Sequence, residues 1–551
     1  MFTQQRQHTQ RMTFLVAACL VVWFSMLPST SHAVLTDNLG IGNAKAISLG
    51  HAVTADPPGI DSIHYNPAGL AKLKGRQRQV KVVTGSFAIE MEMGDYNSDR
   101  YQLLDLVDQA IIDQNLDLPD DFLFDESKNS TSQTEGASMM IPVLGLTDLP
   151  VLLFPLGGAS YSAPGSNITF GTNVYTPMAM GFYRSDDDPG RFIGQRMSFM
   201  MLTYFSPSIA IQVNDEFSVG ASINFNYVGV GLELPFRSPH AGILALAGVQ
   251  DLSGCGSGDP LFDDFCGVLN PYDVIGTLTF EVEKELTFGF NIGFLWEPTP
   301  WVAFGVVYQS PVAMDMEGDY KWVNEDGWVD FIGPLTEGAA GAIVKGVIGI
   351  QGDKVSEGTA YLDMTYPEHL SFGVSLQITP RFKVNVDYKF TAWSEWASIP
   401  VEFSNSIDLL ALASVVPDNE GTTPTNLTFP LGLEDTWNFA IGFEFALSDR
   451  IDLRFGIEDR PSSIPKASRS PLLPISDARF YGTGVGIKLE SGAQLDIGMA
   501  YLHSEVEMPG GTSELGNSNN PQKVIYNPFP GQDITASVDA FLFELSYREE
   551  F

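Results

Sequence analysis

The sequence has few basic residues, little cysteine and, after its first 33 residues, no long apolar run. Its 551 residues include 30 lysines and arginines against 67 aspartates and glutamates, so the formal net charge is −37. A charge of this sign repels nucleic acid and bare anionic surfaces, and we expect neither as a partner. Charged residues make up only 18% of the chain, below the roughly 25% of an average soluble protein.

The N-terminus has the composition of a secretory signal peptide. Two arginines, with no acidic residue among them, precede an apolar run from Phe14 to Leu27, and the small-residue site Ser31-His32-Ala33 follows. That order predicts a signal peptide over residues 1–33, removed after Ala33. A lipoprotein signal ending at Cys19 is the alternative, but the apolar run continues well past that cysteine. We therefore expect the mature chain beyond the inner membrane.

No later stretch reaches the roughly 20 apolar residues that a membrane-spanning helix requires. Instead, many segments of about ten residues alternate apolar and polar positions, as strands of a transmembrane barrel do when one face contacts lipid. In the final segment, Phe541, Phe543, Leu545 and Tyr547 fall at every second position, and the last residue is Phe551. A terminal aromatic residue on an alternating strand resembles the signal that barrel-assembly machinery reads, so we expect that machinery as a partner.

The alternating segments indicate both the fold class and the number of strands. We count at least thirteen, separated by short polar turns and longer connections; Leu286 to Trp296 and Val302 to Met316, for example, form a hairpin. Bacterial barrels have an even number of strands. We predict an all-β fold, a 14-stranded antiparallel transmembrane β-barrel over residues 76–551, in contact with outer-membrane lipid and lipopolysaccharide. A soluble β-protein, the alternative, would bury one sheet face against a second sheet.

The segment before the first strand, residues 34–75, does not alternate. It contains six glycines with small residues between them. Such a chain folds compactly against a larger body, and in a wide barrel the available place is the lumen. We therefore predict an N-terminal plug inside the barrel. A plug argues against a general porin, which needs an open polar lumen, but a porin is the main alternative function.

Two cysteines remain after the signal, Cys255 and Cys266, in an oxidising compartment. They bracket a short loop rich in glycine and aspartate, and we predict a disulfide between them; two free thiols are the alternative. Acidic residues cluster between strands, at 120–125, 186–188 and 259–264. We interpret these clusters as solvated loops or, alternatively, as divalent-cation sites near lipopolysaccharide. Their spacing matches no calcium loop, so we predict neither a metal site nor a cofactor.

No catalytic motif accompanies the histidines of the mature chain. The sequence contains neither G-x-S-x-G nor H-E-x-x-H, the patterns of common serine and zinc hydrolases. His51 and His64, both in the plug, lack a paired cysteine or a metal-ligand spacing, and we expect them to have structural or hydrogen-bonding roles. We predict no enzymatic activity; a barrel-embedded lipid hydrolase is the less favoured alternative. An adhesin or receptor is compatible with the acidic loops, but no pattern identifies its ligand.

Five groups of residues, in order along the chain, resemble the FadL-type outer-membrane transporters of long-chain fatty acids and aromatic hydrocarbons. The plug carries Ala52-Val53-Thr54-Ala55-Asp56 and then Asn66-Pro67-Ala68, similar to the Ala-rich, Asp-containing run that ends in Asn-Pro-Ala in the family's hatch. The further matches are Ser206 to Gly220, Gly289 to Ser310, Tyr388 with Trp393-Ser394, and Asp435 to Asp477.

The resemblance implies a barrel with an N-terminal hatch and passive entry of hydrophobic compounds through the bacterial outer membrane. Substrate would first meet an apolar external loop, and Pro239 to Leu252 sits where the family has one. The ligand would then reach a pocket against the hatch, and hatch movement with a gap in the barrel wall would release it. Residues implied for gating are Asn66, Pro67 and Ala68. Residues implied for ligand binding are Ile243, Leu244, Leu246, Ala247, Arg237 and Arg454.

One departure from the family's pattern concerns the substrate. Family members that carry fatty acids hold the carboxylate with basic side chains, often in a Tyr-Arg-Ser pattern followed by a lysine. This sequence reads Tyr308-Gln309-Ser310, followed by Ala313 and Met314. Because a buried carboxylate without a cation is costly, our hypothesis is a neutral or weakly polar substrate such as a hydrocarbon, unless Arg191, Arg196, Arg237 or Arg454 supplies the charge.

Overall fold

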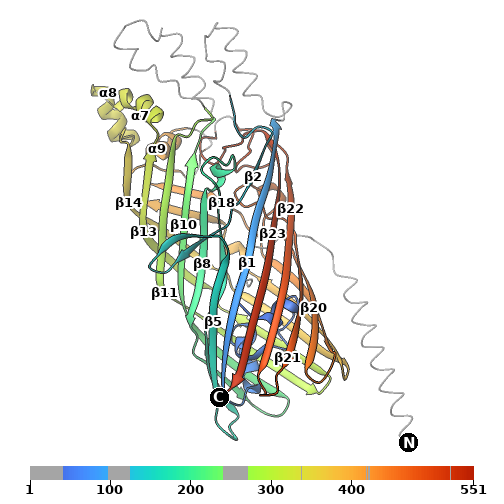
Figure 1. Cartoon of the computed structure of the whole chain (residues 1–551). Helices are drawn as coiled ribbons and strands as arrows, with labels where there is room; N and C mark the ends of the chain where they lie inside the picture. The colour runs from blue at the N-terminus through green and yellow to red at the C-terminus, as the bar shows by residue number, and fades with distance from the viewer. Residues whose placement is uncertain are drawn as a thin grey trace, which may run out of the picture.

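The computed structural model describes residues 41–96, 124–239, 271–336, 338–416, 419, 422–520 and 523–551. A continuous antiparallel sheet closes on itself, because β1 (Gly75–Tyr96) pairs along its length with β23 (Gln532–Glu550). Figure 1 shows a tall barrel in which the blue first strand lies beside the red last strand. The predicted fold class, a 14-stranded antiparallel barrel, is confirmed. The predicted signal peptide, the disulfide pair and the apolar loop segment 241–252 lie outside the described residues.

Fourteen antiparallel spans form the wall, and several consist of two strand segments in line. We predicted one strand from Val302 to Met316, but the structure divides it at Pro311, because proline has no N–H to donate to the sheet. The spans in chain order are β1; β2 (Ser130–Gln133) with β5 (Leu152–Ser162); β6 (Ile168–Asn173) with β7 (Tyr175–Tyr183); β8 (Arg196–Phe205) with β9 (Ser208–Gln212); β10 (Phe217–Phe236); β11 (Gly276–Thr299); β12 (Val302–Gln309) with β13 (Val312–Asn324); β14 (Val355–Tyr366) with β15 (His369–Thr379); β16 (Phe382–Thr391) with β17 (Ser398–Phe403); β18 (Asn426–Pro430) with β19 (Thr436–Ala446); β20 (Ile451–Arg460); β21 (Ala478–Lys488); β22 (Gln494–Met508); and β23.

The two faces of the wall differ as the alternation predicts. Along β11, the outward side chains are exposed and apolar at every second position from Leu286 to Trp296, whereas the residues between them are buried. This stretch corresponds to the apolar band, about 25 Å tall, of transmembrane barrels. Above it the outward residues become charged, with Glu285, Glu283 and Glu281.

The two ends of the barrel differ in the length of their connections. Short turns join β11 to β12, β15 to β16 and β19 to β20 at the lower end in Figure 1. Longer connections and the helices α7 (Asp326–Ile332), α8 (Gly338–Ile343) and α9 (Asp408–Ser414) lie at the upper end. Because transmembrane barrels have short periplasmic turns and long extracellular loops, we assign the lower end to the periplasm.

A small hairpin, β3 (Ala137–Ile141) with β4 (Gly145–Leu149), leaves the second span and forms its own sheet. It packs against wall positions whose side chains face outward, since the Met140 N–H donates to Ser198 Oγ at 2.7 Å and its side chain lies over Gly229. The hairpin therefore covers the outer face of β8 and β10. The sequence did not predict it.

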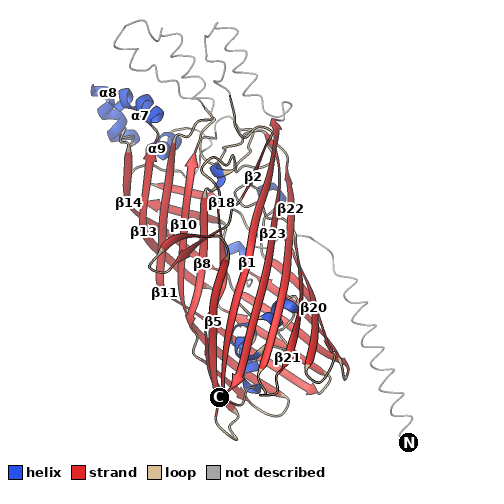
Figure 2. Ribbon diagram, viewed as in Figure 1, coloured by secondary structure: helices blue, strands red, loops and turns tan. Residues whose placement is uncertain are grey.

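Residues 41–74 fill the lower lumen with short helices, which are blue inside the red barrel in Figure 2. They are α2 (Ala44–Ser48), η1 (Gly59–Asp61), α3 (Ser62–Tyr65) and η2 (Pro67–Lys72). The remaining short helical segments are η3 (Arg191–Ile193), η4 (Gly333–Thr336), η5 (Val344–Ile348), η6 (Trp393–Glu395) and η7 (Lys466–Ser468). Within the described ranges, no helix is long and apolar enough to cross a membrane.

Candidate functional site

The hatch, residues 41–74, owes its compact path to caps and to backbone with positive φ. Asn43 caps α2, since its side-chain oxygen accepts a hydrogen bond from the Ala46 N–H at 3.0 Å. After α2 the chain turns through Gly50 and His51, with φ of 59° and 58°. Glycine adopts this conformation freely, whereas a histidine there is strained and has to be held by its surroundings.

Strand glycines let the hatch backbone lie directly against the wall. A Cβ on Gly456 would lie 2.0 Å from the carbonyl carbon of Leu49, and one on Gly220 would lie 2.3 Å from that of Pro67. No side chain fits at such distances, so these positions accept only glycine unless the hatch moves. The glycine belt comprises Gly220, Gly293, Gly305, Gly373, Gly442, Gly456, Gly482 and Gly498, which come from eight different strands.

The predicted gating residues Asn66, Pro67 and Ala68 lie at a joint between the hatch and the wall. Asn66 is fully buried; its Nδ2 donates to the Thr54 carbonyl at 2.8 Å and to the Phe294 carbonyl of β11 at 3.0 Å. Its Oδ1 accepts from the Ala68 N–H at 3.2 Å and so caps η2. One amide thus holds two hatch turns and one strand together.

A buried carboxylate ties the hatch to the first strand. Asp61 pairs with Lys81 of β1, and both side chains are fully buried. The same carboxylate accepts hydrogen bonds from Asn43 Nδ2 at 2.6 Å, Gln79 Nε2 at 2.5 Å and Asn173 Nδ2 at 2.7 Å. Because every one of these donors is buried, the network compensates for the cost of removing both charges from water.

Further carboxylates on the opposite wall hold the next hatch turn. Asp387 of β16 accepts hydrogen bonds from the N–H groups of Val53 and Thr54, both at 2.8 Å. Glu458 of β20 contacts His51 Nδ1 at 2.9 Å and also Lys389 Nζ at 2.7 Å. Burial lowers the pKa of His51, although its contact with Glu458 acts in the opposite direction.

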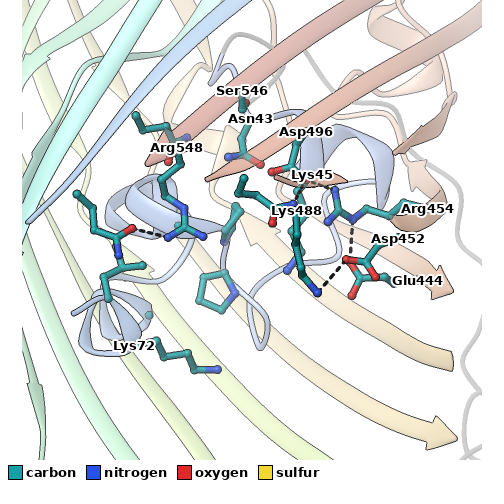
Figure 3. Close-up of a pocket in the computed structure, with 18 residues that line it drawn as sticks. Asn43, Lys45, Lys72, Glu444, Asp452, Arg454, Lys488, Asp496, Ser546 and Arg548 are labelled. Atoms are coloured by element: carbon teal, nitrogen blue, oxygen red, sulfur yellow. Dashed lines mark hydrogen bonds and ion pairs between the residues drawn. The ribbon is translucent and has the colours of Figure 1, made fainter. Parts of the chain in front are cut away.

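A polar cavity of about 380 Å³ lies beneath the hatch on the periplasmic side (Figure 3). Lys45, Glu444 and Arg454 are among its lining residues. Beside it, Asp56 contacts Lys45 and Lys383, both at 2.8 Å, and Lys383 contacts Glu444, also at 2.8 Å. Arg454 continues the chain of ion pairs from Glu444 to Asp496. The floor of the lumen is therefore ionic.

The lumen above the hatch is apolar. One continuous cluster of buried hydrophobic side chains, which we name the upper lumen, draws on every span except the second, the eleventh and the twelfth. It includes three neighbouring rings: the ring centroid of Trp396 lies 5.3 Å from that of Phe199 and 5.4 Å from that of Trp393. The interior of the barrel therefore changes from apolar to ionic at the level of the hatch.

The predicted ligand arginines are both engaged by carboxylates, and they lie at different ends of the barrel. Arg237, beyond the upper end of β10, is buried, and its Nη1 contacts Asp125 Oδ1 at 2.7 Å. Arg454 lies beside the periplasmic cavity (Figure 3). They cannot form one site. Ile243, Leu244, Leu246 and Ala247, like Cys255 and Cys266, lie outside the described residues.

Sequence reasoning missed the residues that fasten the hatch. Lys81, Asp387 and Glu458 are charged residues at inward positions of otherwise alternating strands. That pattern was a usable signal, because a charge facing the lumen at membrane depth needs a partner. The identity of each partner depended on the folded register.

The chain is similar in sequence to known outer-membrane proteins. A sequence model of the family described as "Outer membrane protein transport protein (OMPP1/FadL/TodX)" matches residues 24–551. The long-chain fatty acid transport protein of Salmonella typhi is 22% identical over 329 residues, which cover 53% of this chain and 68% of that protein. Outer membrane protein P1 of Haemophilus influenzae is 22% identical over 373 residues, 67% of this chain and 68% of that protein.

Solved structures share the fold. A Pseudomonas aeruginosa FadL homologue superposes with a TM-score of 0.63 at 18% identity and covers 95% of this chain and 100% of its own. The Ralstonia pickettii toluene transporter TbuX gives 0.55 at 16% identity, with 93% of this chain and 99% of its own covered. Since the family model matches nearly the whole chain, the protein belongs to the OMPP1/FadL/TodX family of outer-membrane transport proteins.

Proposed function

We propose that this protein passively admits neutral or weakly polar hydrophobic molecules, in preference to fatty acids, and releases them past the hatch. Transport of hydrophobic compounds across the bacterial outer membrane, without catalysis, is the activity of the family to which it belongs. The proteins that it resembles include a long-chain fatty acid transport protein and a toluene transporter. The choice between these substrate classes rests on the lumen of this chain.

The observation that carries the preference is the pairing of the buried cations. Among the described residues, five basic side chains are buried, and each has a carboxylate within 4 Å. They are Lys81, Arg184, Arg237, Arg454 and Arg460. A fatty-acid carboxylate entering the lumen would have to displace one of these carboxylates, whereas a neutral molecule gains roughly 0.8 kcal/mol for each CH₂ that it buries and displaces no charge.

The experiment compares ligands that differ only in the head group. Purified protein is titrated with oleate and with a neutral alkene of the same chain length. We expect the neutral ligand to bind at least as tightly as oleate. Tight binding of oleate with no binding of the alkene would refute the preference. Swelling of protein-containing liposomes in small sugars tests the alternative porin: rapid swelling would favour an open polar pore.

The hatch role of Asn66, Pro67 and Ala68 is part of the proposal. Asn66→Ala removes the donor to Thr54 and Phe294 and the cap of η2, so two buried carbonyls lose a partner at a cost of about 1–3 kcal/mol. We expect faster hydrogen–deuterium exchange in residues 62–73 and faster ligand release. Asn214→Ala, in an exposed periplasmic turn, is the matched control. Exchange and release equal to those of the wild type would contradict a gating role.

A further inference from the structure

The polar cavity beneath the hatch lies between two parts of the chain. Its lining includes Asn43, Lys45 and Gly59 of the hatch, and also Gln77 and Arg548 of the first and last strands. Figure 3 shows side chains from the hatch and from the wall around the same space. A molecule bound in this cavity would therefore contact the hatch and the barrel wall together.

The charges around the cavity balance one to one, with a single exception. The chain of ion pairs along the floor holds three cations and three carboxylates. Two more exposed pairs lie beside it, Lys488 with Asp452 at 3.5 Å and Lys72 with Glu297 at 2.9 Å. The remaining cation of the lining is Arg548: within the described part of the chain, no carboxylate oxygen lies within 4.0 Å of its guanidinium.

Neutral groups hold Arg548 in place. It is half-buried, its Nη1 donates to Gln77 Oε1 at 2.6 Å, and its side chain packs on Gly59, where an added Cβ would lie 3.1 Å from Nε. The carboxylate of Asp496, at an inward position of the neighbouring strand β22, pairs with Arg454 instead. A guanidinium has five N–H donors, so most of those on Arg548 are available to a ligand in the cavity.

The chemistry of this position fits an oxyanion. The planar guanidinium fork matches the oxygens of a phosphate or carboxylate group, and partial burial strengthens their attraction. Ser546, two residues earlier on the same face of β23, also lines the cavity. Its Oγ accepts a hydrogen bond from the Ala44 N–H at 3.2 Å, which leaves the hydroxyl proton for a ligand.

We propose that the cavity binds a small oxyanion from the periplasm, with a phosphate or carboxylate group on Arg548 and Ser546, and that the bound anion holds the hatch in its seated position. A ligand that binds only the seated hatch stabilises it by mass action. The chain carries a net charge of −37 and repels anions in general, so binding at this place depends on the site and not on overall attraction. The inference concerns the periplasmic side and is independent of the cargo.

The test uses the folded, full-length protein at a constant ionic strength set with chloride. Inorganic phosphate and acetate are titrated separately by calorimetry, which distinguishes a phosphate group from a carboxylate group as the ligand. Arg548→Gln removes the charge, and Gln77→Glu places a carboxylate where Nη1 donates, so that the site is filled from within. The control is Arg450→Gln, the same change at an exposed arginine of a periplasmic turn outside the cavity.

Heat-modifiable migration in gels verifies that each variant is a folded barrel. If Arg548→Gln does not fold, Gln77→Glu, which is isosteric and leaves the last strand unchanged, carries the test. Hydrogen–deuterium exchange of residues 44–73, with and without the anion, measures the hold on the hatch.

We expect the wild type and the Arg450 control to bind one anion per barrel, and both cavity variants to lose at least tenfold in affinity. At an anion concentration ten times the dissociation constant, exchange in the wild-type hatch should slow by roughly tenfold. No binding of either anion by the wild type, or unchanged affinity in the cavity variants, overturns the site. Binding without slower exchange overturns the hold on the hatch. Each of these results leaves the proposed transport function intact, because the oleate and alkene titrations test that function separately.

Discussion

At the scale of single residues, the buried ion pair of Asp61 and Lys81 is the firmest tie between hatch and wall. Both side chains are completely buried, and three further amides donate to the carboxylate. A charge in this position is stable only as long as its partner is present, because an unpaired charge away from water is far more costly than the pair. The pair therefore makes the hatch sensitive to single substitutions.

Lys81→Met should destabilise the protein by about 3–5 kcal/mol, since it leaves Asp61 charged and unpaired. The double variant Lys81→Met/Asp61→Asn should recover much of this loss, because it removes both charges. The free energy of unfolding in urea, measured for both single variants and the double variant, gives the coupling. Additive effects in the double variant would mean that the two side chains do not interact.

At the scale of elements, the glycine belt brings the backbone of the hatch directly against the backbone of the wall, in addition to the side-chain hydrogen bonds and ion pairs between them. Gly456 touches the backbone between Leu49 and Gly50, and Gly305 touches that of Thr54. Because backbone lies against backbone, there is no flexible side chain that could move aside. The hatch is either seated as described or displaced as a unit.

Gly456→Val should displace the hatch, since its Cβ would overlap the Leu49 carbonyl carbon. We expect liposomes containing this variant to swell in small sugars, which the wild type should exclude. Gly346→Val, where nothing lies within 4 Å of the added Cβ, is the control and should behave as the wild type. Exclusion of sugars by the Gly456 variant would show that the hatch does not seal the lumen.

The hatch should also loosen in acid. Burial lowers the pKa of His51 and of His64 below the usual value of about 6.5. At these two histidines the seated hatch binds fewer protons than a released one, so their contribution to its stability is complete above about pH 6.5 and declines as the pH falls below that value. Exchange protection of residues 44–73 at pH 8 and pH 5.5, corrected for intrinsic rates, measures the change. Equal protection at both pH values would contradict it.

At the scale of the whole molecule, the band of exposed apolar residues indicates which outward positions lie within the bilayer. On β11 the apolar band from Leu286 to Trp296 centres near Ile292, and Glu285 lies just above it. The hatch lies at the end with short turns, and the upper lumen opens toward the long loops. The upper lumen therefore lies on the side of the long loops, and the ionic floor lies on the side of the short turns.

Ile292→Arg should cost about 2–4 kcal/mol, as for basic residues near the middle of the bilayer, whereas Glu285→Arg should cost about 0–1 kcal/mol. Denaturant unfolding in lipid vesicles measures both. Equal costs would mean that the band is not where the exposed apolar residues place it.

The fold followed from the sequence because the information is local. A period of two along ten residues distinguishes a lipid face from a lumen face, and closure follows because an open sheet edge cannot exist in lipid. The glycine-rich segment before β1 had no pattern of its own, which was enough to predict a plug. The extracellular helices α7, α8 and α9 were not predicted, since each is only six or seven residues long.

The sequence by itself thus determined a closed, plugged barrel of fourteen strands and its family resemblance. Only the tertiary structure decided which residues fasten the plug, because those partners are as distant as His51 and Glu458, 407 positions apart. It likewise decided that Arg237 pairs with Asp125, and that apolar residues from distant strands form one buried cluster. Alternation fixes the face on which a side chain lies, but only strand register and closure fix what stands opposite it.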